Sequence, residues 1–280
     1  MSVQPISETL SPPAAAEKTN LIGSEQWDAS WATTAAPIRL RPWRDYLSWR
    51  FCQVFREYIH PGSRVLEVGC GGSRFLPYFA KDLGAEVWGF DFAPAGVNSA
   101  RAALRRAGAD GTILQADLFD PAGVPLNYFD VVFSGGFIEH FPDTVEVLRH
   151  ITRFARKGTG LVITEVPNVG GWFFSKLQKW IDPELYHQHV ILKPAQMEAA
   201  HDLAGAQPIQ PTQYFGTICL GVVSYNRLLR HIPGPVATML KRSIEIPQVL
   251  LTAPFWLCRT KFESATLSPF VLGVYQRTGD

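Results

Sequence analysis

The sequence predicts an α/β fold in which a mostly parallel sheet is covered by helices on both faces. Short apolar runs alternate with segments of about a dozen residues that have the helical apolar period, which is typical of βαβ units. A glycine-rich turn follows the first run, where sheets of this kind bind ligands beyond their strand ends. The 280 residues, 46% of them hydrophobic, suffice for one large domain with additions.

The predicted elements follow one another regularly after residue 60. Apolar runs predict strands at 64–68, 86–90, 112–115, 129–133, 160–166, 209–215 and 269–275. Helical spacing predicts helices at 75–83, 94–106, 142–156 and 194–204. The alternation loosens beyond Pro167, where residues 170–181 are rich in aromatic side chains.

Two further regions flank or interrupt this core. Residues 1–24 are rich in Ser, Pro, Ala and Thr and have no apolar period, so they predict a disordered tail. Apolar residues at helical spacing from Trp43 to Ile59 predict a helical cap within 25–60. We expect the core at 61–215, a helical insertion or lid at 216–262, and the last core strand within 263–280.

Composition excludes several classes of protein. A net charge of +1 disfavours a nucleic-acid binder that depends on a strongly basic surface. Cys52, Cys70, Cys219 and Cys258 are widely spaced and form no CxxC pair, which favours a reducing cytoplasm over a disulfide scaffold. We see no signal peptide and no apolar run of about 20 residues, so the expectation is a soluble, cytoplasmic protein.

The turn after the first strand, Gly69-Cys70-Gly71-Gly72, has features that narrow its ligand. Glycines there let the backbone approach a ligand closely, although many nucleotide-binding proteins share that property. A dinucleotide fingerprint requires G-x-G-x-x-G, and here Arg74 takes the place of the third glycine. Glu67, just before the turn, suits a ligand with an ammonium group better than a pyrophosphate.

Polar or small residues also mark the ends of the next three strands. Asp91 ends the second strand, where a carboxylate can hold both hydroxyls of a ribose. Asp117 follows the third, where it can accept a hydrogen bond from an adenine amino group. The fourth strand ends in Ser134-Gly135-Gly136. Together with Glu67 at the end of the first strand, these make four features at successive strand ends, and they predict one nucleoside-containing ligand.

Together these motifs resemble the class I methyltransferases that use S-adenosylmethionine (SAM), in the small-molecule branch that includes the ubiquinone-pathway O-methyltransferases. The matching text is VLEVGCGGS at 65–73, WGFDFA at 88–93, LQADLFD at 114–120 and FDVVFSGGFIEHF at 129–141. The resemblance covers roughly residues 60–210, and SPFVLGVYQR at 268–277 fits the closing antiparallel strand. It implies a Rossmann-like sheet of seven strands.

The resemblance also implies roles for individual residues. Glu67, Gly69, Gly71 and Ser134 would contact the methionine part of SAM, Asp91 the ribose, and Asp117 and Leu118 the adenine. The cofactor-binding set is completed by their neighbours Gly72, Phe92 and Gly135. A nucleic-acid methyltransferase is disfavoured, because Ser134-Gly135-Gly136-Phe137 stands where an N-P-P-Y-type loop would be.

The acceptor side is less explicit. The methyl group of SAM is already activated, so the enzyme mainly aligns an acceptor, and a hydroxyl acceptor also needs a base. His189 is the first candidate for the base, followed by His140 in the Glu139-His140-Phe141 segment and by His187. We predict no metal, because no carboxylate triad, Cys or further His lies near the His187-x-His189 pair in sequence.

Aromatic residues in the segments expected around the methyl group indicate a flat or hydrophobic acceptor. The candidates that we expect to bind it are Trp27, Trp31, Phe137, Trp172, Tyr186 and Tyr214. The predicted function is O-, N- or C-methylation of a small aromatic or hydrophobic molecule. The alternatives are methylation of a sugar or a lipid-linked intermediate at a membrane surface, an NAD(P)-dependent oxidoreductase, and a binding protein without catalytic activity.

The insertion has a charge pattern of its own. Between Tyr214 and Phe262 there are six basic residues and one acidic residue, interleaved with apolar ones. Such a segment suits a lid over the acceptor, a homodimer face, or a helix lying on an anionic membrane. We rank these three in that order.

Overall fold

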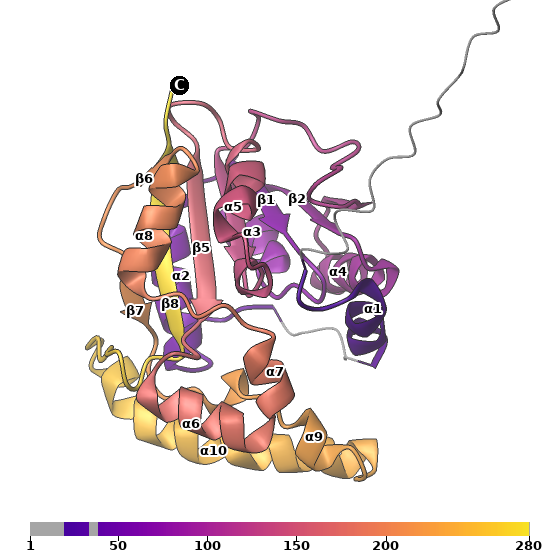
Figure 1. Cartoon of the computed structure of the whole chain (residues 1–280), viewed down its shortest axis with the longest axis vertical. Coiled ribbons are helices and arrows are strands. Elements are labelled where there is room, and N and C mark those ends of the chain that lie inside the picture. Colours follow the sequence, from indigo (N-terminus) through magenta and orange to yellow (C-terminus); the bar gives the residue numbers. More distant parts are fainter. Residues whose placement is uncertain (1–19, 34–38, 280) are drawn as a thin grey trace, which may run out of the picture.

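The computed structural model describes residues 20–33 and 39–279. Its centre is a sheet in the order β3-β2-β1-β4-β5-β8-β6, with β7 also paired to β8 (Figure 1). The short strands β6 and β7 pair with opposite ends of β8, so they share the position at that edge. The sheet thus has seven strand positions, as the sequence predicted.

All pairs from β3 to β5 are parallel, and β8 runs antiparallel to β5. The strands are β1 (Arg64–Val68), β2 (Glu86–Asp91), β3 (Thr112–Gln115), β4 (Val131–Gly135), β5 (Leu161–Pro167), β6 (Ala206–Pro208), β7 (Gln213–Phe215) and β8 (Phe270–Arg277). Because β1 to β4 are parallel, the residues at their carboxyl ends meet along one edge of the sheet.

Successive residues of each strand belong to two cores on opposite faces of the sheet. Val65 packs with α2 (Tyr46–Tyr58), α3 (Leu76–Leu83) and α4 (Pro94–Ala107). Leu66 packs with α5 (Thr144–Thr152) and α8 (Pro194–Leu203). This alternation follows from the two-residue period of a strand and confirms helices on both faces.

Local signals in the sequence define several helix ends. The Asp45 carboxylate accepts the Ser48 N–H and caps α2. Gly84 and Gly108 adopt left-handed conformations after α3 and α4. These two helices therefore end within one residue of their predicted limits.

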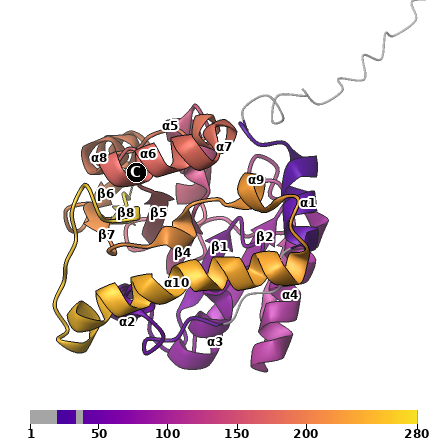
Figure 2. The ribbon, with the colours of Figure 1, turned by 90° about the horizontal axis from the view of Figure 1, so that it is seen from below.

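The remaining helices form a layer at one end of the sheet, which lies at the bottom of Figure 1. They are α6 (Trp172–Ile181), α7 (Pro183–His187), η2 (Leu220–Val222), α9 (Asn226–Leu229) and α10 (Gly234–Leu257). The view from below shows α10 crossing in front of the sheet (Figure 2). Among the described helices, none is both long enough and apolar enough to cross a membrane.

Some boundaries differ from the predictions for identifiable reasons. The fourth strand begins at Val131 rather than Phe129, because Phe129 makes only an isolated bridge to Ala155. Helix α5 ends at Thr152, where the chain turns to form that bridge. Residues 1–19 of the predicted tail lie outside the described part, but residues 20–24 are described and Ile22 is buried.

Candidate cofactor and acceptor site

The glycine turn after β1 has the backbone geometry that only glycine adopts readily. Gly69 and Gly72 have φ values of +67° and +63°. Gly71 is required for space, because a Cβ there would lie 2.6 Å from Trp31 Nε1 and 2.8 Å from Asp91 Oδ2. The turn therefore presents bare backbone to the cavity beside it.

Glu67 is buried behind this turn and held by Ser73. The Ser73 hydroxyl donates to Glu67 Oε2 at 2.6 Å, and its oxygen accepts the N–H groups of Phe75 and Leu76. Burial raises the pKa of Glu67 to about 8. A ligand ammonium group nearby would favour the ionised carboxylate.

Asp91 ends β2 with both carboxylate oxygens fixed by backbone groups. Oδ2 accepts the Gly71 N–H at 2.8 Å, and Oδ1 accepts the Ala93 N–H at 2.9 Å. Burial is the main reason that its pKa is raised to about 6. Each oxygen keeps a further lone pair, so the carboxylate can accept two ribose hydroxyls without losing these bonds.

Two adjoining cavities lie along the carboxyl ends of these strands. The smaller is about 220 Å³ and is lined by Asn20, Ile22, Gly23, Gly69, Phe90, Asp91, Phe92, Ala116, Asp117, Leu118, Phe119, Phe137 and Phe141. The larger is about 510 Å³, and its lining includes Trp27, Trp31, Glu67, Gly69, Gly71, Gly72, Arg74, Phe75, Asp91, Gly135, Phe137, His140 and Phe270. Gly69, Asp91 and Phe137 line both, so the two cavities form a continuous elongated site.

Asp117 is positioned at the end of the smaller cavity by its own loop. Its Oδ1 accepts the Phe119 N–H at 2.8 Å, and the adjacent Leu118 is buried. Among the predicted cofactor residues, Asp117 and Leu118 line the smaller cavity but not the larger one, whereas Phe92 lines both. The arrangement suits a flat heterocycle that is separated from Glu67 by a ribose.

The end of β4 contributes differently from what the sequence implied. Gly135 lines the larger cavity, whereas Ser134 is fully buried and is not among the lining residues of either cavity. Its hydroxyl has no hydrogen-bond partner among the described residues. The Phe137 ring lies so close to Gly69 that a Cβ there would be 2.5 Å from Cδ2. An aromatic ring thus stands between the two cavities.

The N-terminal segment covers this site. The sequence had predicted that residues 20–23 belong to a disordered tail, whereas here they contact the site. The Leu21 N–H donates to the His140 carbonyl at 2.8 Å. Helix α1 (Ser24–Thr33) is fixed to α4 where the Ala95 N–H donates to Asp28 Oδ1 at 2.8 Å. Trp31 from this helix lies over the glycine turn, and Trp27 stacks against it with ring centroids 6.0 Å apart.

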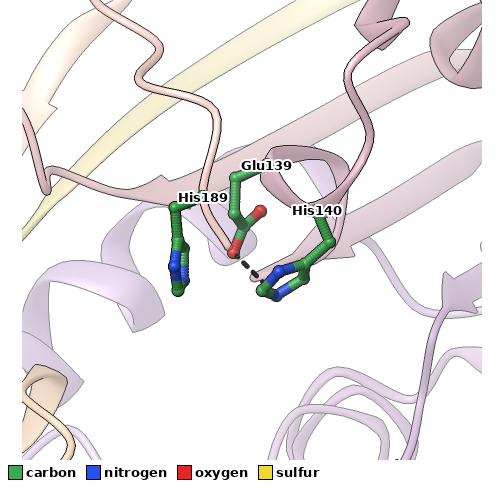
Figure 3. Close-up of side chains that lie close together, drawn as sticks. All are labelled: Glu139, His140 and His189. Carbon is green, nitrogen blue, oxygen red and sulfur yellow. Dashed lines mark ion pairs between the residues drawn. The ribbon is translucent and has the colours of Figure 1, made fainter. Parts of the chain in front are cut away.

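Glu139, His140 and His189 converge beside the larger cavity, which His140 lines (Figure 3). Their ligand atoms all lie within 4.8 Å of one another. The Nδ1 of His140 faces the Gln188 carbonyl at 3.2 Å, and that of His189 faces the Leu185 carbonyl at 2.6 Å. Burial lowers the pKa of His140 to about 4, lowers that of His189, and raises that of Glu139 to about 8.

The remaining candidates from the sequence lie apart from this cluster. His187 is exposed at the end of α7. Trp172 is 62% exposed, Tyr186 packs under the Lys179 ammonium group, and Tyr214, a residue of β7, packs against the hydrophobic core. None of these four lines either cavity. Trp27, Trp31 and Phe137 are the predicted acceptor residues that the structure brings together.

Two charged residues at this end were not anticipated. The Arg74 side chain lines the larger cavity and donates from Nη2 to Ser48 Oγ at 2.8 Å. Glu165, near the end of β5, is buried, and burial holds the pKa of its carboxyl well above the usual range. A charged residue within the apolar strand LVITEVP is the one sequence signal that marks Glu165.

Comparison with known proteins finds similarity to methyltransferases. A family model described as a methyltransferase domain matches residues 66–163. The ubiquinone biosynthesis O-methyltransferase of Vibrio parahaemolyticus is 32% identical over 143 residues, which are 49% of this chain and 60% of that protein. The matched part thus spans less than two thirds of that relative.

Solved structures share the fold at low sequence identity. Phosphoethanolamine N-methyltransferase 2 of Haemonchus contortus, in complex with phosphomonomethylethanolamine and S-adenosylhomocysteine, has a TM-score of 0.56 at 17% identity, covering 91% of this chain and 57% of that one. The [4+2]-cyclase SpnF has a TM-score of 0.57 at 16% identity, covering 92% and 96%. Residues 66–163 thus match a methyltransferase-domain model, and the chain has the Rossmann-like fold that its motifs predicted.

Proposed function

We propose that this protein transfers a methyl group from SAM to a hydroxyl of a small aromatic or hydrophobic acceptor. The observation that carries the proposal is the continuous pair of cavities, with Asp117, Asp91 and Glu67 spaced along it in that order. An adenine, a ribose and an amino acid follow one another in the same order in SAM. No other class of ligand that we considered matches all three carboxylates.

The donor half of the site fits SAM at each point. The smaller cavity is apolar apart from its carboxylates and takes the adenine beside Asp117 and Leu118. Asp91 is oriented by two backbone N–H groups and accepts the ribose hydroxyls. Glu67 and the bare glycine turn then face the methionine part, whose ammonium group favours the ionised carboxylate.

The rest of the larger cavity suits the acceptor. Trp27, Phe75, Phe137 and Phe270 supply aromatic walls, and these favour a flat or hydrophobic molecule. His140 supplies a polar group at the end where Glu139 and His189 also lie. The O-methyltransferase name of the Vibrio relative supports a hydroxyl as the methylated group.

Two measurements test the proposal. Isothermal titration with SAM, S-adenosylhomocysteine and NAD should give saturable binding of the first two and none of NAD. Methyl transfer from radiolabelled SAM should then be assayed with a vicinal aromatic diol, a phenol, an aromatic amine and a sugar, and the diol or phenol should accept the label. Binding of NAD instead would favour an oxidoreductase, and SAM binding without transfer to any acceptor would favour an inactive binding protein.

A further inference from the structure

We propose that Glu139, His140 and His189 form a binding site for a divalent transition-metal ion at the acceptor end of the larger cavity. The three side chains come from two segments: Glu139 and His140 from η1 (Ile138–His140), and His189 from the segment after α7. Figure 3 shows them grouped around one point, with their ligand atoms within 4.8 Å of one another. Small side-chain rotations bring such a set to the roughly 2 Å metal–ligand distances of nitrogen and oxygen donors.

The two imidazoles are already oriented as metal ligands. A carbonyl oxygen only accepts hydrogen bonds, so the Nδ1 atoms of His140 and His189 must carry the protons that face the Gln188 and Leu185 carbonyls. Each Nε2 is then left with its lone pair. Metal-binding histidines usually show this arrangement, in which the second ring nitrogen donates to a carbonyl or carboxylate.

The carboxylate of Glu139 supplies an independent observation. Its residue is 1% exposed, and Oε2 has no hydrogen-bond partner among the described residues. Oε1 lies 3.7 Å from His140 Nε2, which is longer than a hydrogen bond. Leaving a buried carboxyl oxygen without a partner costs free energy, and a cation at this point would remove that cost.

The ligand set indicates the class of metal. Two imidazoles and one carboxylate suit zinc and the other late first-row divalent ions, whereas magnesium and calcium prefer oxygen ligands throughout. Three protein ligands leave a coordination position open. His140 lines the larger cavity, so an ion held at this site would lie beside the space that we assign to the acceptor.

The role of the ion rests on the proposed function. A coordinated hydroxyl has a lowered pKa, so it loses its proton to solvent more readily. Its oxygen then forms a bond to the methyl carbon while the carbon–sulfur bond of SAM breaks. The electron pair of that bond stays on sulfur, and S-adenosylhomocysteine is the second product.

Metal binding can be measured separately from methyl transfer. The full chain, freed of metal with a chelator, is titrated with Zn²⁺ by calorimetry and with Co²⁺ by visible absorption. One ion should bind per chain, and Glu139→Gln and His189→Asn should each weaken that binding at least 100-fold. The matched control is His187→Asn, which removes an exposed histidine two residues from His189 and should leave metal affinity within threefold of the original.

The outcomes distinguish this proposal from the proposed function. Saturable SAM binding by a chain that binds neither metal, or equal metal affinity in all variants, would overturn the metal site and leave the methyltransferase proposal intact. Loss of SAM binding in the original chain would instead overturn the proposed function. If Glu139→Gln does not fold, the melting temperature of the original chain with and without Zn²⁺ decides, since an ion that binds the native state raises it.

A second inference concerns α10, whose polarity is inverted. The side that packs on the protein carries Gln248, which accepts the Leu220 N–H, and the buried Thr252. The opposite side is apolar and exposed at helical spacing. This exposed apolar face consists of Val236, Met239, Leu240, Ile246, Leu250, Leu251 and Leu257.

We infer that this face of α10 lies on an anionic membrane surface. The exposed residues Arg227, Arg230, Lys241, Arg259 and Lys261 accompany it in the insertion, so its charge complements anionic lipid headgroups. The helix is also near the acceptor cavity, because α10 packs on η2 and Gly221 and Val222 of η2 line that cavity. This reverses the order expected from sequence, in which a lid came first.

Co-sedimentation with vesicles tests this inference. The full chain should sediment with vesicles of phosphatidylglycerol and phosphatidylcholine, and at least tenfold less with phosphatidylcholine alone. Leu250→Ser together with Leu251→Ser should reduce sedimentation at least fivefold without changing SAM affinity, and the control Leu203→Ser, an exposed leucine on α8, should have no effect. Equal sedimentation of all variants would overturn the inference. The inference would also be overturned if light scattering showed a dimer that Leu250→Ser with Leu251→Ser dissociates.

Discussion

Replacing Asp91 with asparagine should weaken the binding of S-adenosylhomocysteine by about one to two orders of magnitude. Both carboxylate oxygens accept backbone N–H groups, at 2.8 Å from Gly71 and 2.9 Å from Ala93. The amide of asparagine must turn its NH₂ group toward one of these donors, so one backbone bond is lost. The ribose also loses a hydrogen bond to a charged group. The backbone bond is lost in the free and in the bound protein alike, so the change in Kd comes from the ribose contact, which at ~1.5–3 kcal/mol corresponds to roughly 10- to 160-fold.

The assay is calorimetric titration at several pH values. The raised pKa of Asp91, about 6, means that its carboxyl is ionised above pH 6 and protonated below. Affinity of the original chain should therefore fall as pH decreases through 6, while that of Asp91→Asn should not change over this range. Asp110→Asn, an exposed position before β3, is the control. A Kd for Asp91→Asn within threefold of the original, with the same pH dependence, would refute the assignment of Asp91 to the ribose.

Three further substitutions test other contacts. Gly71→Ala should weaken SAM binding at least tenfold by titration, because its Cβ would press on the Trp31 ring, whereas Gly234→Ala has open space and should not. Glu263→Ala should lower the free energy of unfolding in urea by about 3 kcal/mol, because it leaves the buried Arg50 guanidinium without the carboxylate that binds it at 2.7 Å. His201 has its pKa lowered to about 3 by burial, so its contribution to stability is complete above pH 6.5 and is lost as pH falls toward 3. Between pH 4 and 6, the slope of the free energy of unfolding against pH should therefore be smaller in His201→Phe than in the original chain, by about 1.4 kcal/mol per pH unit. Equal slopes in the two proteins would show that the His201 imidazole does not remain neutral in the folded state.

The donor half of the site was predictable because it depends on local sequence. Gly69 and Gly71 follow β1 directly, Asp91 ends β2, and Asp117 comes two residues after β3. In a parallel sheet these positions meet at one edge whatever the rest of the chain does. Correct strand limits were thus enough to bring the residues together.

The acceptor half was less predictable because it is made by contacts between distant segments. The segment after α7 is held against η1 where the Val190 N–H donates to the Glu139 carbonyl at 2.6 Å and His140 Nδ1 faces the Gln188 carbonyl at 3.2 Å, and this brings His189 to Glu139 and His140. Nothing in the spacing of these residues indicates that contact. The expectation of no metal was drawn from neighbours in sequence, whereas Glu139, His140 and His189 are neighbours in space.

Helix α10 shows a related limit on what periodicity can establish. The apolar residues interleaved with basic ones led us to expect a helical insertion here, but such a pattern does not say which face of a helix is turned inward. A buried apolar face is the usual outcome, because burial removes apolar area from water. Here Thr252 is 3% exposed and Leu250 is 70% exposed, so the apolar residues of the outer face do not gain that burial. An apolar face kept in water over many turns requires another surface to cover it, and the basic residues beside it make an anionic bilayer the best match.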